Sequence, residues 1–184
     1  MKTSTFSALA ALSLMALFIV FLSGCPTNPP KTVDSVDVAR YAGKWYEIAR
    51  YPVVFQRGLV GVTAEYTQNP DGTVGVFNRG LRKTLDGPES TITAVAKVVD
   101  TTTNSKLSVR FDRFPISLFP ADYWIVDLGE NYDYAAVSGP SRQYLWILSR
   151  TPQMDDTVYD GILERLTANG FDVSKLEKTL QPAN

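Results

Sequence analysis

The chain from Tyr41 to Arg150 is a succession of short segments rich in β-branched and aromatic residues, each ended by turn residues. This pattern is typical of all-β sandwiches and barrels. Turns such as Asn69-Pro70-Asp71-Gly72 are tight, so consecutive strands are expected to lie side by side and antiparallel. We expect eight strands, at residues 44–50, 62–68, 73–79, 91–99, 106–111, 123–128, 134–138 and 144–150.

The segment after Arg150 changes to a helical period. Asp155 or Asp156 is expected to cap the start of a helix, and Gly170 stands where a left-handed residue would end it. This helix is expected to pack outside the strands, and a short ninth strand is expected near residues 179–181. The apolar face of the helix repeats every fourth residue, at Val158, Ile162 and Leu166.

Side chains along a strand point alternately to its two sides, so the sequence predicts which residues face inward. In the strand at 91–99, small and aliphatic residues alternate with threonine and lysine, and the apolar face is expected to be the inner one. An eight-stranded up-and-down barrel has room for one small ligand, and small inward residues add to that room. We therefore expect an all-β fold, an eight-stranded antiparallel up-and-down β-barrel with one C-terminal α-helix packed outside. A barrel filled by facing aromatic side chains is the alternative to an open cavity.

The composition excludes several kinds of site. The 184 residues include no histidine, which excludes Ser-His-Asp and Cys-His catalysis and histidine metal sites. A formal net charge of -1 and scattered lysines and arginines give no reason to expect a nucleic-acid partner. An enzyme would need Ser, Lys or carboxylates in a catalytic arrangement, and the sequence shows none. We expect no catalytic residues, no metal site and no cofactor.

The N-terminal segment has the three zones of a secretory signal: a basic start, an apolar run from Phe6 to Leu22, and small residues before Cys25. The run is about long enough to cross a bilayer, so a membrane-spanning anchor is the alternative. Leu22-Ser23-Gly24-Cys25 resembles the lipobox of bacterial lipoproteins, which implies that the signal is cleaved before Cys25 and that this cysteine is acylated. The family pattern also implies the outer membrane, because Pro26 and not Asp follows the cysteine.

Three segments are therefore expected: a signal peptide at 1–24, a lipidated and proline-rich tether at 25–36, and a folded domain at 37–184. The single cysteine lies in the tether, so the domain has no disulfide and depends on packing for its stability.

Three motifs of the domain resemble the conserved regions of the lipocalins. They are Gly43-Lys44-Trp45 at the first strand, Tyr132-Asp133-Tyr134 before the seventh, and Arg150 at the end of the eighth. The resemblance extends from about Asp37 to the end of the chain, and it is closer still to the bacterial lipoprotein lipocalins. It implies that Trp45 closes one end of the barrel and that Arg150 lies across the indole as a cation–π partner. Gly43, Trp45, Asp133 and Arg150 are thus expected to be structural.

The resemblance also implies a ligand inside the barrel, bound toward its open end. A fatty acid or a lysophospholipid suits a lining that is mostly apolar with a few hydroxyls, and the expected role is to store or move such lipids during envelope maintenance. Two alternatives remain: a lipoprotein with a filled barrel that only binds partners, and a lipid hydrolase or isomerase. The oligomeric state is open, a homodimer included. The inward positions implied by the family pattern are Ala64, Tyr66, Val76, Asn78, Ala94, Val109, Phe111, Tyr123, Ile125, Ala136, Ser138, Tyr144 and Trp146.

Four arginines fall in loops or at strand ends and are candidates for contact with an anionic head group: Arg57, Arg79, Arg82 and Arg113. A solvated side chain is the alternative for each of them.

Overall fold

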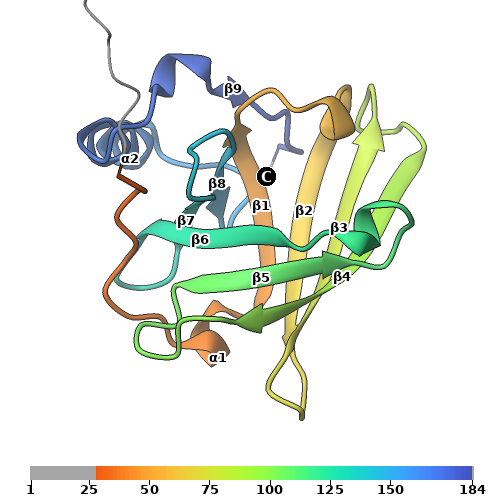
Figure 1. The fold of residues 1–184 in the computed structure, drawn as a ribbon. Coiled ribbons are helices and arrows are strands. Elements are labelled where there is room, and N and C mark those ends of the chain that lie inside the picture. The colour runs from red at the N-terminus through yellow and green to blue at the C-terminus, as the bar shows by residue number, and fades with distance from the viewer. Residues whose placement is uncertain (1–27, 184) are drawn as a thin grey trace, which may run out of the picture.

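A computed structural model describes residues 28–183 (Figure 1). The predicted signal segment and Cys25 lie outside these residues. The strands are β1 (Gly43–Arg50), β2 (Leu59–Gln68), β3 (Val74–Arg82), β4 (Glu89–Val98), β5 (Lys106–Phe111), β6 (Ala121–Leu128), β7 (Tyr134–Ser138), β8 (Leu145–Ser149) and β9 (Glu177–Lys178). The helices are α1 (Val38–Tyr41) and α2 (Asp156–Ala168), with single 3-10 turns at η1 (Val54–Gln56), η2 (Ile116–Leu118) and η3 (Val173–Lys175).

The strands close into an antiparallel barrel. Each strand from β2 to β8 pairs with the next, β8 pairs with β1, and β1 pairs with β2. The predicted eight-stranded barrel with one helix outside is confirmed. The strand bounds at 106–111 and 134–138 agree with the prediction, whereas β2 and β3 are longer than predicted.

The seam between β1 and β2 is completed by a distant segment. The two strands pair directly only from Gly43 to Tyr46. Farther along, β9 pairs with β1, the Thr179 amide donates to Ile48 O at 2.9 Å, and the Gly61 amide donates to Leu180 O at 2.7 Å. The ninth strand was predicted at 179–181 and lies at Glu177–Lys178, but the residues after it continue along the seam in extended form.

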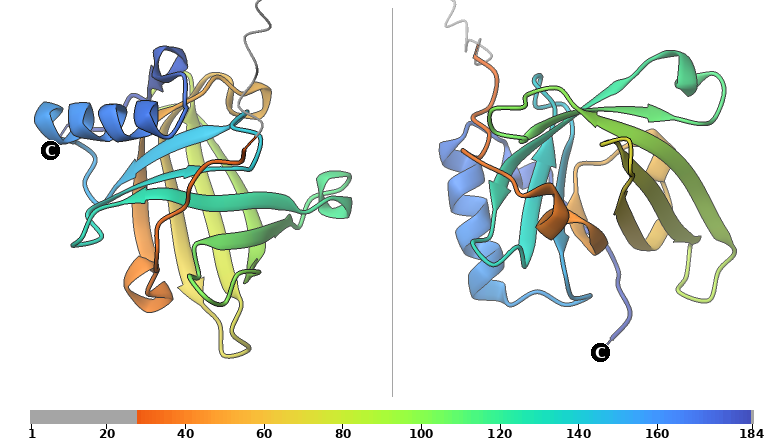
Figure 2. Two further views of the ribbon diagram at one scale, coloured as in Figure 1. Left: turned by 60° about the vertical axis from the view of Figure 1, so that its left-hand side comes forward. Right: turned by 90° about the horizontal axis from the view of Figure 1, so that it is seen from below.

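Helix α2 lies outside the barrel, as Figure 2 shows. Asp155 caps its start by accepting from the Thr157 amide at 2.8 Å, and Gly170 after its end has φ +83°, as predicted. Its buried residues Tyr159, Ile162 and Leu166 pack on the outer faces of β1, β6, β7 and β8. No helix within residues 28–183 is long and apolar enough to cross a membrane.

Because α2 covers β7, this strand is buried on both faces. Both sets of alternate side chains are therefore apolar, and the sequence does not show which set points into the barrel. Ala135 and Val137 belong to the interior cluster, whereas Ala136 packs under the helix. The prediction that Ala136 and Ser138 face the cavity is therefore wrong. Ser138 pairs with residues that face the helix, and its hydroxyl donates to Tyr144 O at 2.5 Å.

The barrel has two different ends. We call the end covered by α1 the closed end; its loops are 69–73, 99–105, 129–133 and 150–155. We call the other end the open end; its loops are 51–58, 83–88, 112–120 and 139–144, and they carry η1 and η2. The right-hand view of Figure 2 shows α1 lying across the closed end.

Candidate functional site

The closed end is sealed by Trp45 and Arg150. Trp45 is fully buried, and its indole donates to Tyr41 O at 2.9 Å. The Arg150 guanidinium lies 3.8 Å from the centroid of this indole, which places a cation over the aromatic face as the motif predicts. The same guanidinium donates to backbone carbonyls of four separate residues: Arg40, Tyr41, Lys44 and Tyr132.

The two other motif residues lie beside this pair. Gly43 has φ +94°, a conformation that favours glycine, and a Cβ there would lie 3.3 Å from the Arg150 guanidinium. The Asp133 carbonyl accepts from the Arg150 amide at 2.9 Å, so the backbone of Asp133 also holds the arginine. These contacts are structural and involve no group that could act on a ligand.

Three buried tyrosines form the floor of the interior above Trp45. The Tyr123 hydroxyl is 2.8 Å from that of Tyr41 and 2.9 Å from that of Tyr66. Burial raises the pKa of Tyr66 to about 12, and it raises those of Tyr41 and Tyr123 well above their ordinary range. All three are therefore neutral at physiological pH. Tyr66 and Tyr123 were expected in the lining, whereas Tyr41 lies in α1 and was missed.

The walls above the floor are apolar. Val76, Ala94 and Val109 are buried, and Ala94 lies opposite Val76 on one side and Phe111 on the other. The remaining expected wall residues that face inward are Ala64, Asn78, Phe111, Ile125 and Trp146.

The upper part of the interior is accessible to solvent. Asn78, Phe111 and Trp146 face inward and yet stay partly exposed, in contrast to the buried Trp45 and Tyr66 of the lower part. Aromatic side chains are thus buried in the closed half, and inward side chains of the open half keep contact with solvent.

Aromatic side chains also line the mouth. Tyr144 is 43% exposed and stacks on Trp146 with a centroid distance of 5.8 Å, and its ring is 6.4 Å from that of Phe55 in η1. The Trp146 indole donates to the Gln56 side chain at 2.9 Å. Tyr144 therefore lies at the rim of the interior and not deep within it.

A buried ion pair lies just below the mouth and was not predicted. The Arg50 guanidinium donates to the Glu47 carboxylate at 2.7 Å, and both residues are more than nine-tenths buried. Thr179 bonds to both partners, and Gln56 donates to the second carboxylate oxygen at 2.8 Å. Strict alternation from the inward-facing Trp45 would place Arg50 on the outer face. A bulge between Glu47 and Ala49 shifts the alternation by one residue and turns Arg50 to the inner face.

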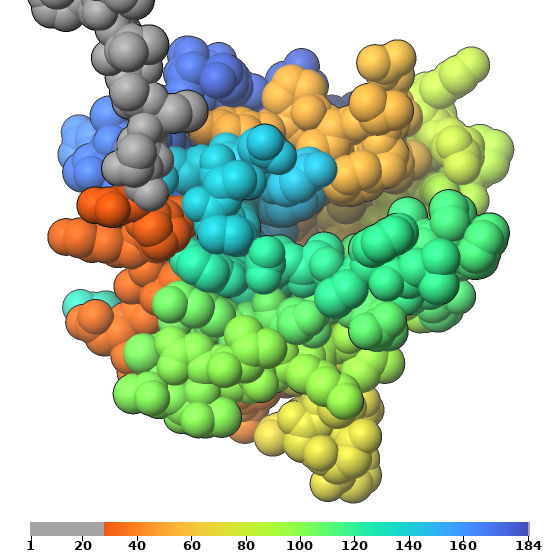
Figure 3. Space-filling model, viewed as in Figure 1, coloured from red at the N-terminus to blue at the C-terminus, as the bar shows by residue number. Residues whose placement is uncertain are grey.

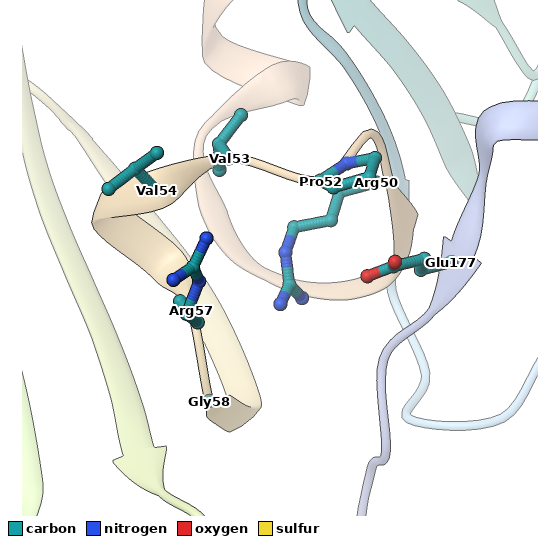
Figure 4. A pocket seen from close by; sticks show the side chains of 7 residues that line it. All are labelled: Arg50, Pro52, Val53, Val54, Arg57, Gly58 and Glu177. Atoms are coloured by element: carbon teal, nitrogen blue, oxygen red, sulfur yellow. The ribbon is translucent and has the colours of Figure 1, made fainter.

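Arg50 borders a hollow of about 310 Å³ under the loop that carries η1, shown in Figure 4. Arg57 and Glu177 also line this hollow, and in Figure 4 the Arg50 side chain lies between them. The Nε atom of Arg50 has no hydrogen-bond partner among the described residues. The loop arginines differ in their surroundings. Arg79 pairs with Glu89 at 2.5 Å on the outer wall, and Arg57, Arg82 and Arg113 lie exposed at the open end.

The described residues contain no group of three or more Asp, Glu, His or Cys side chains that could hold a metal ion. The chemistry that this interior offers is enclosure of an apolar molecule, with basic side chains at the mouth.

Comparison with known proteins fixes the family. A model of the lipocalin-like domain matches residues 36–181, nearly the whole described chain. The chain is a lipocalin. The lipocalin Blc, named an outer membrane lipoprotein, of Escherichia coli K12 is 39% identical over 172 residues, which cover 92% of this chain and 94% of that protein.

A second curated relative and a solved structure extend this likeness. Temperature-induced lipocalin-1 of Arabidopsis thaliana is 39% identical over 159 residues and covers 82% of each chain. Insecticyanin of the tobacco hornworm Manduca sexta superimposes with a TM-score of 0.66 at 21% identity, covering 85% of each chain, and shows the shared fold.

Proposed function

We propose that this lipocalin is a lipid-anchored outer-membrane protein that encloses the acyl chain of a fatty acid or lysophospholipid. One observation carries the proposal: inward side chains of the open half remain accessible above an apolar wall and an aromatic floor. An acyl chain can lie along this wall, and its anionic head would stay near Arg50 and Arg57. The physiological role would be to store or carry such lipids during maintenance of the envelope.

The outer membrane is the location of the protein, in agreement with the name that its relatives in Vibrio cholerae and Escherichia coli share. The anchor is proposed to be an acylated Cys25 after cleavage of residues 1–24. Cys25→Ser is expected to abolish incorporation of radiolabelled palmitate. Equal labelling of the variant and the wild type would contradict the proposal.

The cavity itself is tested at Ala94, which is 5% exposed and faces inward. Ala94→Phe places a ring where the acyl chain would lie and is expected to weaken fatty-acid binding about tenfold, or ~1.4 kcal/mol. If the barrel were filled, the same change would instead cost ~1–3 kcal/mol of stability, and there would be no affinity to lose.

Val95→Phe is the matched control, because Val95 is the next residue on β4 and is 44% exposed on the outer wall. Titration with a fluorescent fatty acid and a thermal melt of both variants separate the two cases. Unchanged affinity in a folded Ala94→Phe variant would remove this wall from the site.

A further inference from the structure

The exposed apolar side chains of the barrel gather at one end. Seven of the twelve large apolar side chains that are exposed within the described residues lie in the loops of the open end. The four most exposed of these are Val54, Phe114, Phe119 and Phe55, at 81%, 77%, 73% and 68%. Exposed apolar patches of this kind mark surfaces that contact a partner or a membrane. The other three are Ile116, Leu118 and Tyr144.

All but Tyr144 lie in two loops, the η1 and η2 tips, on opposite sides of the mouth. The η1 loop joins β1 to β2, and the η2 loop joins β5 to β6, which lie across the barrel from that pair. Figure 3 shows the η1 loop (orange) at the upper edge of the molecule, and the left-hand view of Figure 2 shows the η2 loop extending from the barrel. A groove-binding peptide would contact one tip, whereas an extended apolar layer can accept both at once.

Charge is distributed unevenly between the two ends. The open-end loops carry four basic residues, Arg57, Lys83, Arg113 and Arg142, and two acidic ones, Asp86 and Asp112. The closed-end loops carry five acidic residues and one basic residue, Arg150. The Arg150 guanidinium lies over the Trp45 ring and donates to backbone carbonyls. This asymmetry would orient the open end toward a negatively charged surface.

The start of the described chain is fixed beside the same end. The Arg142 guanidinium donates to Asn28 O at 2.7 Å, and the Asn169 side chain bonds twice to the backbone of Lys31. In the left-hand view of Figure 2, this start and the η1 and η2 loops all lie away from α1. Three peptide units separate Cys25 from Asn28, so their Cα atoms are at most ~11 Å apart. The anchor proposed at Cys25 would therefore hold the open end close to the membrane.

We propose that the open end docks on the surface of an anionic phospholipid bilayer, with the η1 and η2 tips inserted at the interface and the mouth facing the lipid. Aromatic and aliphatic side chains combined with basic ones are the composition that binds such an interface. A lipid would then pass between bilayer and barrel without crossing water. A second copy of the chain is the competing occupant, but a symmetric mouth-to-mouth pair would bring the basic loops of both copies together.

The test uses the full chain reconstituted in vesicles of phosphatidylethanolamine and phosphatidylglycerol whose acyl chains carry bromine, which quenches tryptophan fluorescence. Phe119→Trp is expected to add a tryptophan that the bromolipid quenches. Phe77→Trp is the matched control, since Phe77 is 41% exposed on the outer wall of β3. Both substitutions replace exposed rings, so each variant is expected to melt like the wild type. Equal quenching of the two added tryptophans would overturn the proposal.

A second measurement separates docking from ligand binding. The double variant Phe114→Ser and Phe119→Ser, which leaves the mouth residues Phe55 and Tyr144 in place, is expected to take up a fluorescent fatty acid from vesicles about tenfold more slowly, while its affinity for the same fatty acid in solution is unchanged. Absence of binding in solution would overturn the proposed function and leave the quenching result to decide docking. A dimer that this double variant abolishes, with no quenching at residue 119, would assign the surface to a second copy instead.

Discussion

The two ends of the barrel both combine an arginine with a tryptophan, but in different ways. At the closed end, Arg150 lies on Trp45 and bonds to backbone carbonyls, which are fixed by the surrounding strands and α1. At the open end, Arg50 and Trp146 bond to the side chains of Glu47 and Gln56, which come from β1 and η1. The closed-end arginine is therefore hydrogen-bonded to the main chain alone, whereas the open-end pair depends mainly on side chains from separate segments, with one backbone bond from Arg50 to Gln56 O.

The strongest test of this contrast is to remove each tryptophan. Trp45→Ala deletes a fully buried ring and is expected to lower the free energy of unfolding by ~3–5 kcal/mol. Trp146→Ala removes a partly exposed ring and is expected to cost less stability but to weaken lipid binding. Chemical denaturation and fatty-acid titration of both variants measure this. Equal losses of stability would contradict the assignment of one tryptophan to structure and the other to the site.

The tyrosine floor predicts sensitivity to alkaline pH. Burial raises the pKa of Tyr66 from 10.0 to about 12, so the folded state holds its proton more tightly than the unfolded state. This contribution to stability is fully present below the unfolded value and is lost as pH rises through the folded one. At ~1.4 kcal/mol per unit, roughly 2–3 kcal/mol should be lost across this window.

Denaturation of the wild type and of Tyr66→Phe over the same alkaline range measures the effect. The variant lacks the titrating hydroxyl, so its stability is expected to fall less steeply. Identical slopes would show that Tyr66 does not ionise on unfolding in the way its burial requires.

The seam at the open end is tested at Thr179, whose hydroxyl donates to Glu47 at 2.6 Å and accepts from Arg50 at 2.9 Å. Thr179→Val keeps the shape and removes both bonds, at an expected cost of ~1–3 kcal/mol because the partners are charged. Thr179→Ser keeps the hydroxyl and is the control. A valine variant as stable as the serine variant would mean that the tail adds nothing to the ion pair.

The smallest effect concerns the head group. Arg57 is exposed beside the hollow, so Arg57→Gln is expected to weaken binding of an anionic lipid by roughly two- to fivefold, less than ~1 kcal/mol. Arg79→Gln is the control, because Arg79 is paired with Glu89 on the outer wall. Titrations with a fluorescent fatty acid compare them, and an equal effect of both variants would point to general charge and not to the hollow.

Sequence patterns predicted the barrel because strands such as 91–99 alternate cleanly, because turns such as Asn69 to Gly72 are recognisable, and because the motif residues have fixed partners. The predictions were wrong where helix α2 covers the outside of the barrel and incomplete where a bulge interrupts strand β1. The segment 134–138 is apolar on both faces because α2 covers its outer face. Its sequence therefore does not distinguish inward from outward residues, and Ala136 was assigned to the wrong side. The bulge before Ala49 reversed the face on which Arg50 lies, and no residue in β1 is of a type that would predict a bulge there.

The seam between β1 and β2 has a consequence for the order of folding. Glu47 and Thr179 are separated by 132 positions, so the wall of the barrel is completed only by one of the most distant contacts in the chain. A chain that is synthesised from its N-terminus can form its hairpins one after another, but it cannot close the wall until residues 177–181 are available. Until then, the apolar interior is open along one side, so the incomplete chain exposes to association the surface that the closed barrel hides.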